Sequence, residues 1–133
     1  METWIRSVMN INTISGDIVD AAIQVHWHLG PGLLESAYQV CLSYELRDRG
    51  HDVAEQRPLP IVYRDVTIDC GYRLDMLVDD AVIVELKAVT TFAPVHKAQL
   101  LSYLRLSGHK LGLLINFHSA LLKDGIVRMV NDI

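Results

Sequence analysis

The first part of the chain alternates apolar and polar residues at helical spacing. Asp17 is a candidate N-cap, and apolar residues at positions 18, 22 and 25 follow at intervals of three or four. Two glycines around Pro31 break this pattern, and a second helix is predicted from about residue 33 to residue 49, where Gly50 is suited to end it. The apolar stripe of this second helix consists of Leu34, Ala37, Tyr38, Cys41, Leu42 and Leu46. Glu35 lies at the margin of the stripe, so we expect it at the edge of the core.

The middle of the chain is typical of β-strands. Residues 58–63 begin with a proline and predict an extended strand, and residues 66–78 predict one or two more. Asp79 and Asp80 mark a turn, and residues 81–89 form the next predicted strand. Because these strands are joined by short connections, an antiparallel meander is expected.

The last part of the chain returns to a helix and then to strands. Pro94 is suited to the first turn of a helix that ends near residue 107, before Gly108. Residues 110–116 are almost all apolar, which indicates a strand covered on both faces, and residues 125–130 predict a final edge strand. The order of elements predicts an α/β fold with a mixed sheet flanked by helices.

Composition restricts the compartment and the type of protein. The chain has 133 residues, half of them apolar, and is interpreted as one domain over residues 1–133 with a single core. No apolar run approaches the ~18 residues that span a bilayer, and no export signal is recognised, so a cytoplasmic protein without a membrane partner is expected. Cys41 and Cys70 are isolated among apolar residues, and we expect reduced, packed thiols.

The charge balance argues against a protein that coats nucleic acid through bulk charge. There are 12 Lys and Arg against 16 Asp and Glu, which gives a net charge of −4. Contact with phosphates therefore requires a local basic patch or a metal ion in an acidic pocket. Arg64, Arg73, Lys97 and Arg105 are candidates for such a patch, although solvated charge is the ordinary alternative for each.

Three charged residues lie inside the strand-like runs, where burial without a partner is costly. Asp75 is in one run, and ten positions later Glu85 and Lys87 end another. Strand alternation places Glu85 and Lys87 on one face. For Asp75 to lie opposite Glu85, the connecting loop must have an odd number of residues, such as 79–81, or the strands must contain a bulge. A two-residue turn would instead put Asp75 opposite Val84, on the wrong face.

Two carboxylates and a nearby main-chain carbonyl would form an oxygen site suited to Mg²⁺ or Mn²⁺. Such an ion would polarise a phosphoryl oxygen and activate a water, and Lys87 could orient that water and stabilise negative charge. Glu35 could complete the metal shell. A lone Glu-x-Lys at the end of a strand is more often a solvated ion pair, so the hypothesis depends on the combination.

The helix after the lysine carries a further polar pair. Gln99 and Tyr103 are four residues apart, which places them on one helix face, and His96 lies on that face as well. A glutamine among apolar neighbours needs a hydrogen-bonding partner, whereas a tyrosine on an apolar stripe is typical of packing. His26 and His28 are interpreted as surface or interface residues.

Several of these segments match known motifs. Residues 32–38 match GxxExxY, residues 71–75 form a glycine-led segment ending in Asp75, and residues 99–103 match QxxxY. The chain thus resembles the GxxExxY proteins, a branch of the PD-(D/E)xK nuclease superfamily, and the QxxxY motif is similar to that of RecB-like nucleases. Leu74 stands where the superfamily's motif often has proline. The resemblance covers residues 17–130.

The resemblance implies a restriction-endonuclease-like αβββαβ core and a divalent-metal site. The implied metal ligands are Glu35, Asp75, Glu85 and the carbonyl of Leu86. Lys87 matches the catalytic lysine, and Gln99 and Tyr103 match the pair that faces the active site and the DNA backbone. Tyr38 is included as a substrate-positioning candidate, with packing as its alternative role.

The leading hypothesis is a Mg²⁺-dependent or Mn²⁺-dependent nuclease that hydrolyses DNA phosphodiester bonds through a metal-activated water. The first alternative is a catalytically idle nuclease-like fold that binds nucleic acid or protein or acts in regulation. A second is a small structural module in which the charged pairs are plain salt bridges. A homodimer or partner subunit is expected if cleavage is selective, with Trp4 or Trp27 as interface candidates.

Overall fold

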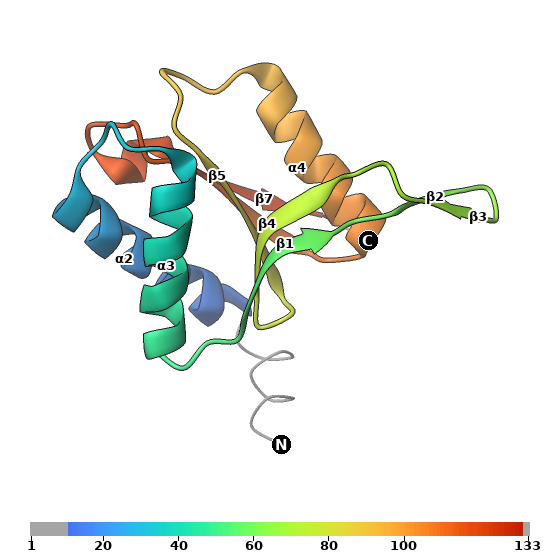
Figure 1. Cartoon of the computed structure of the whole chain (residues 1–133), viewed down its shortest axis with the longest axis horizontal. Coiled ribbons are helices and arrows are strands. Elements are labelled where there is room, and N and C mark those ends of the chain that lie inside the picture. The colour runs from blue at the N-terminus through green and yellow to red at the C-terminus, as the bar shows by residue number, and fades with distance from the viewer. Residues whose placement is uncertain (1–10, 132–133) are drawn as a thin grey trace.

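The structure is a computed structural model that describes residues 11–131. Its elements form a five-stranded mixed sheet with helices on both faces and a separate two-stranded hairpin (Figure 1). In chain order they are α2 (Ile11–Leu29), α3 (Glu35–Asp48), β1 (Val53–Pro58), β2 (Ile61–Tyr63), β3 (Val66–Ile68), β4 (Arg73–Val78), β5 (Val82–Lys87), α4 (Pro94–Ser107), β6 (Leu111–Asn116), the 3₁₀ turn η1 (Leu122–Gly125) and β7 (Ile126–Val130).

The main sheet has the strand order β1-β4-β5-β6-β7. The pair β5–β6 is parallel and the other neighbours are antiparallel. A parallel pair needs a crossover connection, which α4 supplies on one face of the sheet, while α2 and α3 cover the other (Figure 1). This arrangement confirms the predicted α/β mixed sheet flanked by helices.

Each face of the sheet has its own hydrophobic cluster. Ile18, Tyr38 and Leu42 of the α2–α3 layer pack against one face, whereas Leu100 and Leu104 of α4 pack against the other. All six residues of β6 are buried between the two layers, as the apolar run predicted. Close packing of α4 depends on Gly112, because a Cβ there would lie 2.8 Å from the Leu100 side chain.

The elements of the last part of the chain agree with their prediction. The helix α4 begins at Pro94, and Gly108 follows it with φ 75°, a left-handed conformation that suits glycine. The final strand β7 is an edge strand paired with β6. The prediction succeeded here because a proline, a glycine and a continuous apolar run are signals contained in a short stretch of sequence.

The beginnings of the first two helices differ from the prediction. Asp17 lies inside α2 and is not its N-cap, because the helix already includes Ile11. The helix α3 begins at Glu35, so Leu34 precedes it and is 78% exposed instead of contributing to the apolar stripe.

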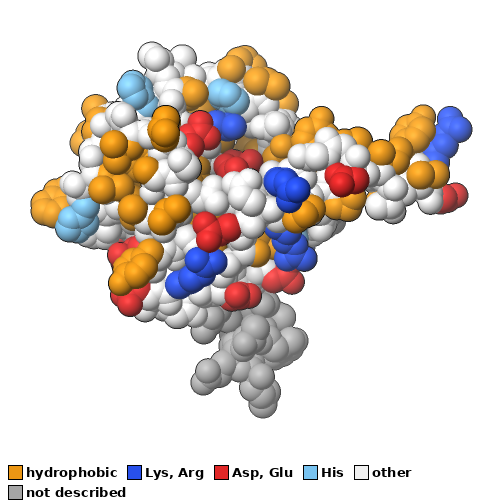
Figure 2. All heavy atoms as spheres, viewed as in Figure 1, with side chains coloured by type: hydrophobic (Ala, Val, Ile, Leu, Met, Phe, Trp, Pro, Cys, Tyr) orange, Lys and Arg blue, Asp and Glu red, His pale blue; other side chains and the backbone are white. Residues whose placement is uncertain are grey.

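The strand β1 was not predicted, and residues 58–63 do not form a single strand. Pro58 ends β1 and Ile61 begins β2, with Pro60 between them. Because β1 pairs with β4, the expected meander is interrupted by the hairpin β2–β3. This hairpin projects from the body of the molecule and carries hydrophobic side chains along its length (Figures 1 and 2).

Two predictions about single side chains, those for Cys70 and His26, were wrong. Cys41 is partly buried, but Cys70 is exposed and therefore not packed, although both cysteines are free as expected. His26 is buried, and its Nε2 lies 2.8 Å from the carbonyl oxygen of Ser119. Trp27 is 76% exposed, and the other interface candidate lies outside the described residues. No helix within residues 11–131 is long and apolar enough to cross a membrane.

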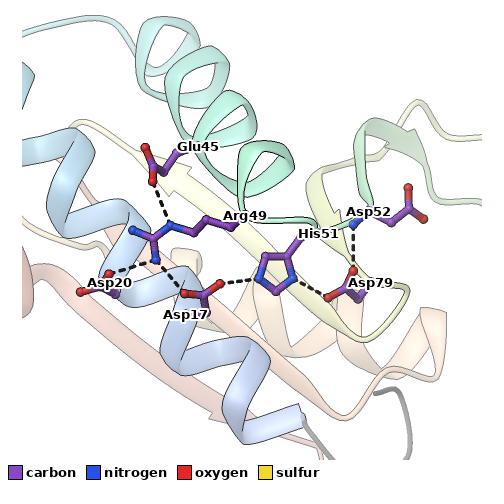
Figure 3. A network of polar contacts seen from close by, with 7 residues as sticks. All are labelled: Asp17, Asp20, Glu45, Arg49, His51, Asp52 and Asp79. Atoms are coloured by element: carbon purple, nitrogen blue, oxygen red, sulfur yellow. Dashed lines mark hydrogen bonds and ion pairs between the residues drawn. The ribbon is translucent and has the colours of Figure 1, made fainter. Parts of the chain in front are cut away.

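A partly buried histidine fixes the loop end of the β4–β5 hairpin (Figure 3). His51 lies between Asp17 of α2 and Asp79 of the hairpin loop, with its Nδ1 2.6 Å from Asp79 Oδ2. Arg49 adds an ion pair of 2.6 Å to the same Asp17 carboxylate. The network therefore joins α2, the end of α3 and the hairpin, which are far apart in the sequence.

Candidate active site

The two predicted acidic residues face each other across the β4–β5 pair. The observed register pairs Met76 with Val84 and Val78 with Val82, which leaves a three-residue loop at positions 79–81. Continued by one residue, this register sets Asp75 opposite Glu85, the arrangement that required an odd loop. The Asp75 backbone N–H donates to Glu85 Oε2 at 2.8 Å. The N–H of Leu86 in turn donates to Asp75 Oδ2, also at 2.8 Å.

Glu85 occupies an unfavourable position for a negative charge. It is only 5% exposed, and burial together with the charge of Asp75 raises the pKa of Glu85 from 4.5 to about 8. The N–H of Asp75 and the charge of Lys87 act in the opposite direction, and the charge of Glu35 raises the pKa further. A cation placed beside these carboxylates would relieve their mutual repulsion.

Lys87 ends β5, two residues after Glu85, and is partly buried. Strand alternation puts its side chain on the same face as Glu85. Its backbone is held in place, since the N–H of Phe117 donates to the Lys87 carbonyl at 2.8 Å. The ammonium group is thus presented from a fixed strand end beside the acidic pair.

Asn116 supports the end of β5 and was missed by the sequence analysis. Its side chain is almost fully buried and forms two hydrogen bonds with the backbone of Val89, at 2.7 and 3.1 Å. It therefore fixes the segment that follows Lys87. The signal that could have revealed it is a single amide at the end of an otherwise apolar buried strand.

Gln56 is a second residue that was missed. It lies in β1, next to Asp75 on β4, and its Nε2 is 3.5 Å from Asp75 Oδ1. Its φ of 49° is uncommon for a residue other than glycine, and it interrupts the pairing between Glu55–Met76 and Arg57–Leu74. Residues held in such conformations concentrate at functional sites, which supports a role for this part of β1.

Helix α4 brings Gln99 and Tyr103 to the same region. Tyr103 is buried, and burial raises the pKa of its hydroxyl, with smaller contributions from the charges of Glu85 and Asp75. These contributions place Tyr103 within electrostatic range of both carboxylates. Gln99 and Tyr103 also line one groove, as expected for residues on one helix face.

His96, the third residue on this face of α4, has a different role. His96 Nδ1 accepts a hydrogen bond of 3.0 Å from the backbone N–H of Ala93, the residue before α4. The ring therefore caps the start of the helix. This contact satisfies one of the free N–H groups of the first turn and does not point to metal binding.

Glu35 does not complete a three-carboxylate group. It is the first residue of α3 and is exposed. Within residues 11–131, no three Asp, Glu, His or Cys side chains come together in an arrangement that could hold a metal ion. Glu35 therefore acts on the acidic pair through its charge, and the predicted set of three carboxylates is not assembled in this structure.

Tyr38 is fully buried and packs face to face on Phe117, with ring centroids 4.4 Å apart. Its hydroxyl donates to the carbonyl of Gly30 and accepts a hydrogen bond of 3.1 Å from the N–H of Leu33. These contacts match the packing role that was the alternative for Tyr38. They fix the loop before α3, and through it the position of Glu35.

Comparison with known proteins assigns the chain to a family. A family model described as "PD-(D/E)XK nuclease superfamily" matches residues 12–129. A search of curated proteins and a search of solved structures returned no match. The GxxExxY branch stays a prediction, whereas the superfamily is established by a match over almost the entire chain. The chain therefore belongs to the PD-(D/E)XK nuclease superfamily.

Proposed function

We propose that the protein is a divalent-metal-dependent nuclease that hydrolyses phosphodiester bonds in DNA. The observation that carries this proposal is the cross-strand pair of Asp75 and Glu85, whose carboxylates each accept a backbone N–H from the neighbouring strand, with Lys87 two residues after Glu85. A buried carboxylate with a raised pKa beside another carboxylate is costly for a purely structural element. A cation bound by the pair would offset this cost.

The donor chemistry of the pair fits Mg²⁺ or Mn²⁺. Each carboxylate uses one oxygen to accept a backbone N–H, so lone pairs remain for a hard cation. Mg²⁺ in proteins is often bound by one or two carboxylates, with waters and substrate phosphates completing its shell. Two carboxylates and the Leu86 carbonyl are therefore a sufficient protein contribution. When bound, the ion would polarise a phosphoryl oxygen and favour ionisation of a water.

The remaining residues would position the reactants. The Lys87 ammonium would orient the attacking water and offset negative charge that develops on the phosphoryl group. Gln99 would donate its amide N–H to a phosphate oxygen, and Tyr103 would limit access of bulk water to the carboxylates. Glu35 would hold a water at the edge of the site. Together these groups supply positioning and electrostatic stabilisation.

The test is cleavage of labelled single-stranded and double-stranded DNA in Mg²⁺, Mn²⁺ or EDTA. Lys87→Ala should reduce the rate at least about 100-fold, as expected for loss of a group that stabilises developing charge. Lys110→Ala is the matched control, because this exposed lysine precedes β6 at the opposite end of the parallel pair β5–β6. Cleavage that persists in EDTA, or that Lys87→Ala leaves unchanged, would contradict the proposal.

A binding or regulatory role is the second candidate, favoured by the lack of a three-carboxylate group within residues 11–131. Calorimetric titration with Mn²⁺ separates the two functions. A nuclease should bind the ion and lose that binding in Asp75→Asn. Millimolar binding without cleavage of any substrate would favour the regulatory role.

A further inference from the structure

An uncharged groove of about 420 Å³ runs along helix α4. One wall is the exposed side of α4, and the other is formed by Ile61 of β2 and Tyr72, which precedes β4. Gln99 and Tyr103, which both have a role in the proposed active site, belong to this groove. Because Tyr103 is also close enough to Glu85 and Asp75 to interact with their charges, the groove adjoins the place proposed for a scissile phosphate.

The lining of the groove is suited to an aromatic, uncharged ligand. None of its lining residues carries a charge, so a phosphate within it would meet no cation. The rings of Tyr72 and Tyr103 meet edge to face, with centroids 6.0 Å apart, and Tyr72 remains 42% exposed. Gln99 and Ser102 add an amide and a hydroxyl that could contact the polar edge of a ring.

A nucleotide could contact both the acidic pair and the groove. Its phosphate would lie at the acidic pair with the cation, and its base would enter the groove and stack on Tyr72. In a duplex the bases are paired and stacked inside the helix, so a base reaches such a groove only from a single strand or after extrusion. The negative net charge agrees with binding that depends on stacking more than on many phosphate contacts.

We propose that this groove binds one unpaired nucleobase of the substrate, and that the substrate is single-stranded DNA or a single-stranded end. This inference rests on the proposed function, since it assumes that the acidic pair receives the neighbouring phosphate. A sequence-tolerant site is expected, because every base has a π-face that can stack on a tyrosine.

The experiment measures binding of a fluorescent oligothymidylate and of a duplex of equal length by anisotropy. All variants carry Lys87→Ala and are titrated in Mg²⁺, so that the DNA is not cut. Tyr72→Ala should weaken single-strand binding about tenfold, the usual size of a base–aromatic stacking contribution, whereas Tyr72→Phe should retain it. Tyr44→Ala is the matched control, since Tyr44 is 73% exposed on α3 and lies outside the groove lining.

A second measurement does not depend on the folding of a variant. Replacing the bases of the oligonucleotide with abasic sugars should weaken binding to the Tyr72-containing protein by at least the same factor. Unchanged affinity in Tyr72→Ala or with the abasic strand would overturn the inference, as would equal affinity for the duplex.

Cleavage by the protein with Lys87 intact separates this inference from the proposed function. If the protein cleaves DNA in a metal-dependent way but Tyr72→Ala does not weaken single-strand binding, the base-binding role of the groove is refuted and the proposed nuclease activity is not. Tyr72-dependent binding without any cleavage would refute the nuclease and support the groove as a single-strand binding site.

Discussion

Replacing Glu85 by glutamine should stabilise the metal-free protein at neutral and alkaline pH. Glutamine keeps an oxygen that can accept the Asp75 N–H, but it removes the charge that burial disfavours. A rise in the pKa of Glu85 from 4.5 to about 8 corresponds to about 5 kcal/mol once the group is fully ionised. At pH 7 the accumulated difference is about 3 kcal/mol.

The sign follows from proton binding. Between pH 4.5 and about 8 the folded protein holds the Glu85 proton more tightly than the unfolded chain does. The free energy of unfolding therefore falls as the pH rises through this window. A divalent cation should reverse the effect, because it favours the ionised carboxylate, and its binding should strengthen with pH.

Urea unfolding between about pH 5 and pH 9 checks this prediction, with and without Mg²⁺. The free energy of unfolding of Glu85→Gln should approach that of the unmodified protein at low pH and exceed it increasingly at high pH. Mg²⁺ should stabilise only the protein that retains Glu85. Asp48→Asn, which removes an exposed carboxylate, is the control and should show no such trend. If the free energy of unfolding depends on pH in the same way for Glu85→Gln and the unmodified protein, the raised pKa of the buried Glu85 is refuted.

Two further changes test the packing around the site. His51→Gln should cost about 3 kcal/mol, because it weakens the compensation of the buried Asp79 carboxylate, whereas Arg47→Ala in an exposed pair should cost less than about 1. Burial lowers the pKa of His51, but its two aspartates outweigh this and raise it, so the imidazolium contribution should disappear as pH rises above that pKa. An equal dependence of the free energy of unfolding on pH for His51→Gln and the unmodified protein would contradict this. Gly125→Ala should destabilise by about 1–3 kcal/mol, since its Cβ would lie 2.7 Å from a backbone oxygen, whereas Gly16→Ala inside α2 should not destabilise. Calorimetric melting temperatures compare the two.

The sequence allowed prediction where the signal was local. The length of the loop at 79–81 could be stated as a condition for Asp75 and Glu85 to meet, and the register satisfies it. The ends of α4 followed from Pro94 and Gly108 for the same reason. Strand alternation and capping depend on a few neighbouring residues, and these are visible in the sequence.

Features that depend on distant partners were not predictable in this way. Asp17 has the side chain of a helix cap, but its contacts with Arg49 and His51 lie more than 30 positions away. The strand β1 is an edge strand whose later residues are exposed, so it lacks the alternation that marks a half-buried strand. Gln56 could not be connected with Asp75 before the pairing of β1 with β4 was known.

The two ends of the β4–β5 hairpin are physically linked. Asp79 and Asp80 both adopt a left-handed backbone conformation, with φ of 53° and 50°, and thereby close a loop of three residues. Asp79 is held by His51 and by the backbone N–H of Asp52. Insertion or deletion of one residue in this loop would turn Asp75 to the opposite face of the sheet, away from Glu85. The polar network in Figure 3 therefore stabilises the loop on which the facing acidic pair depends, although it contributes none of the residues proposed to contact the substrate.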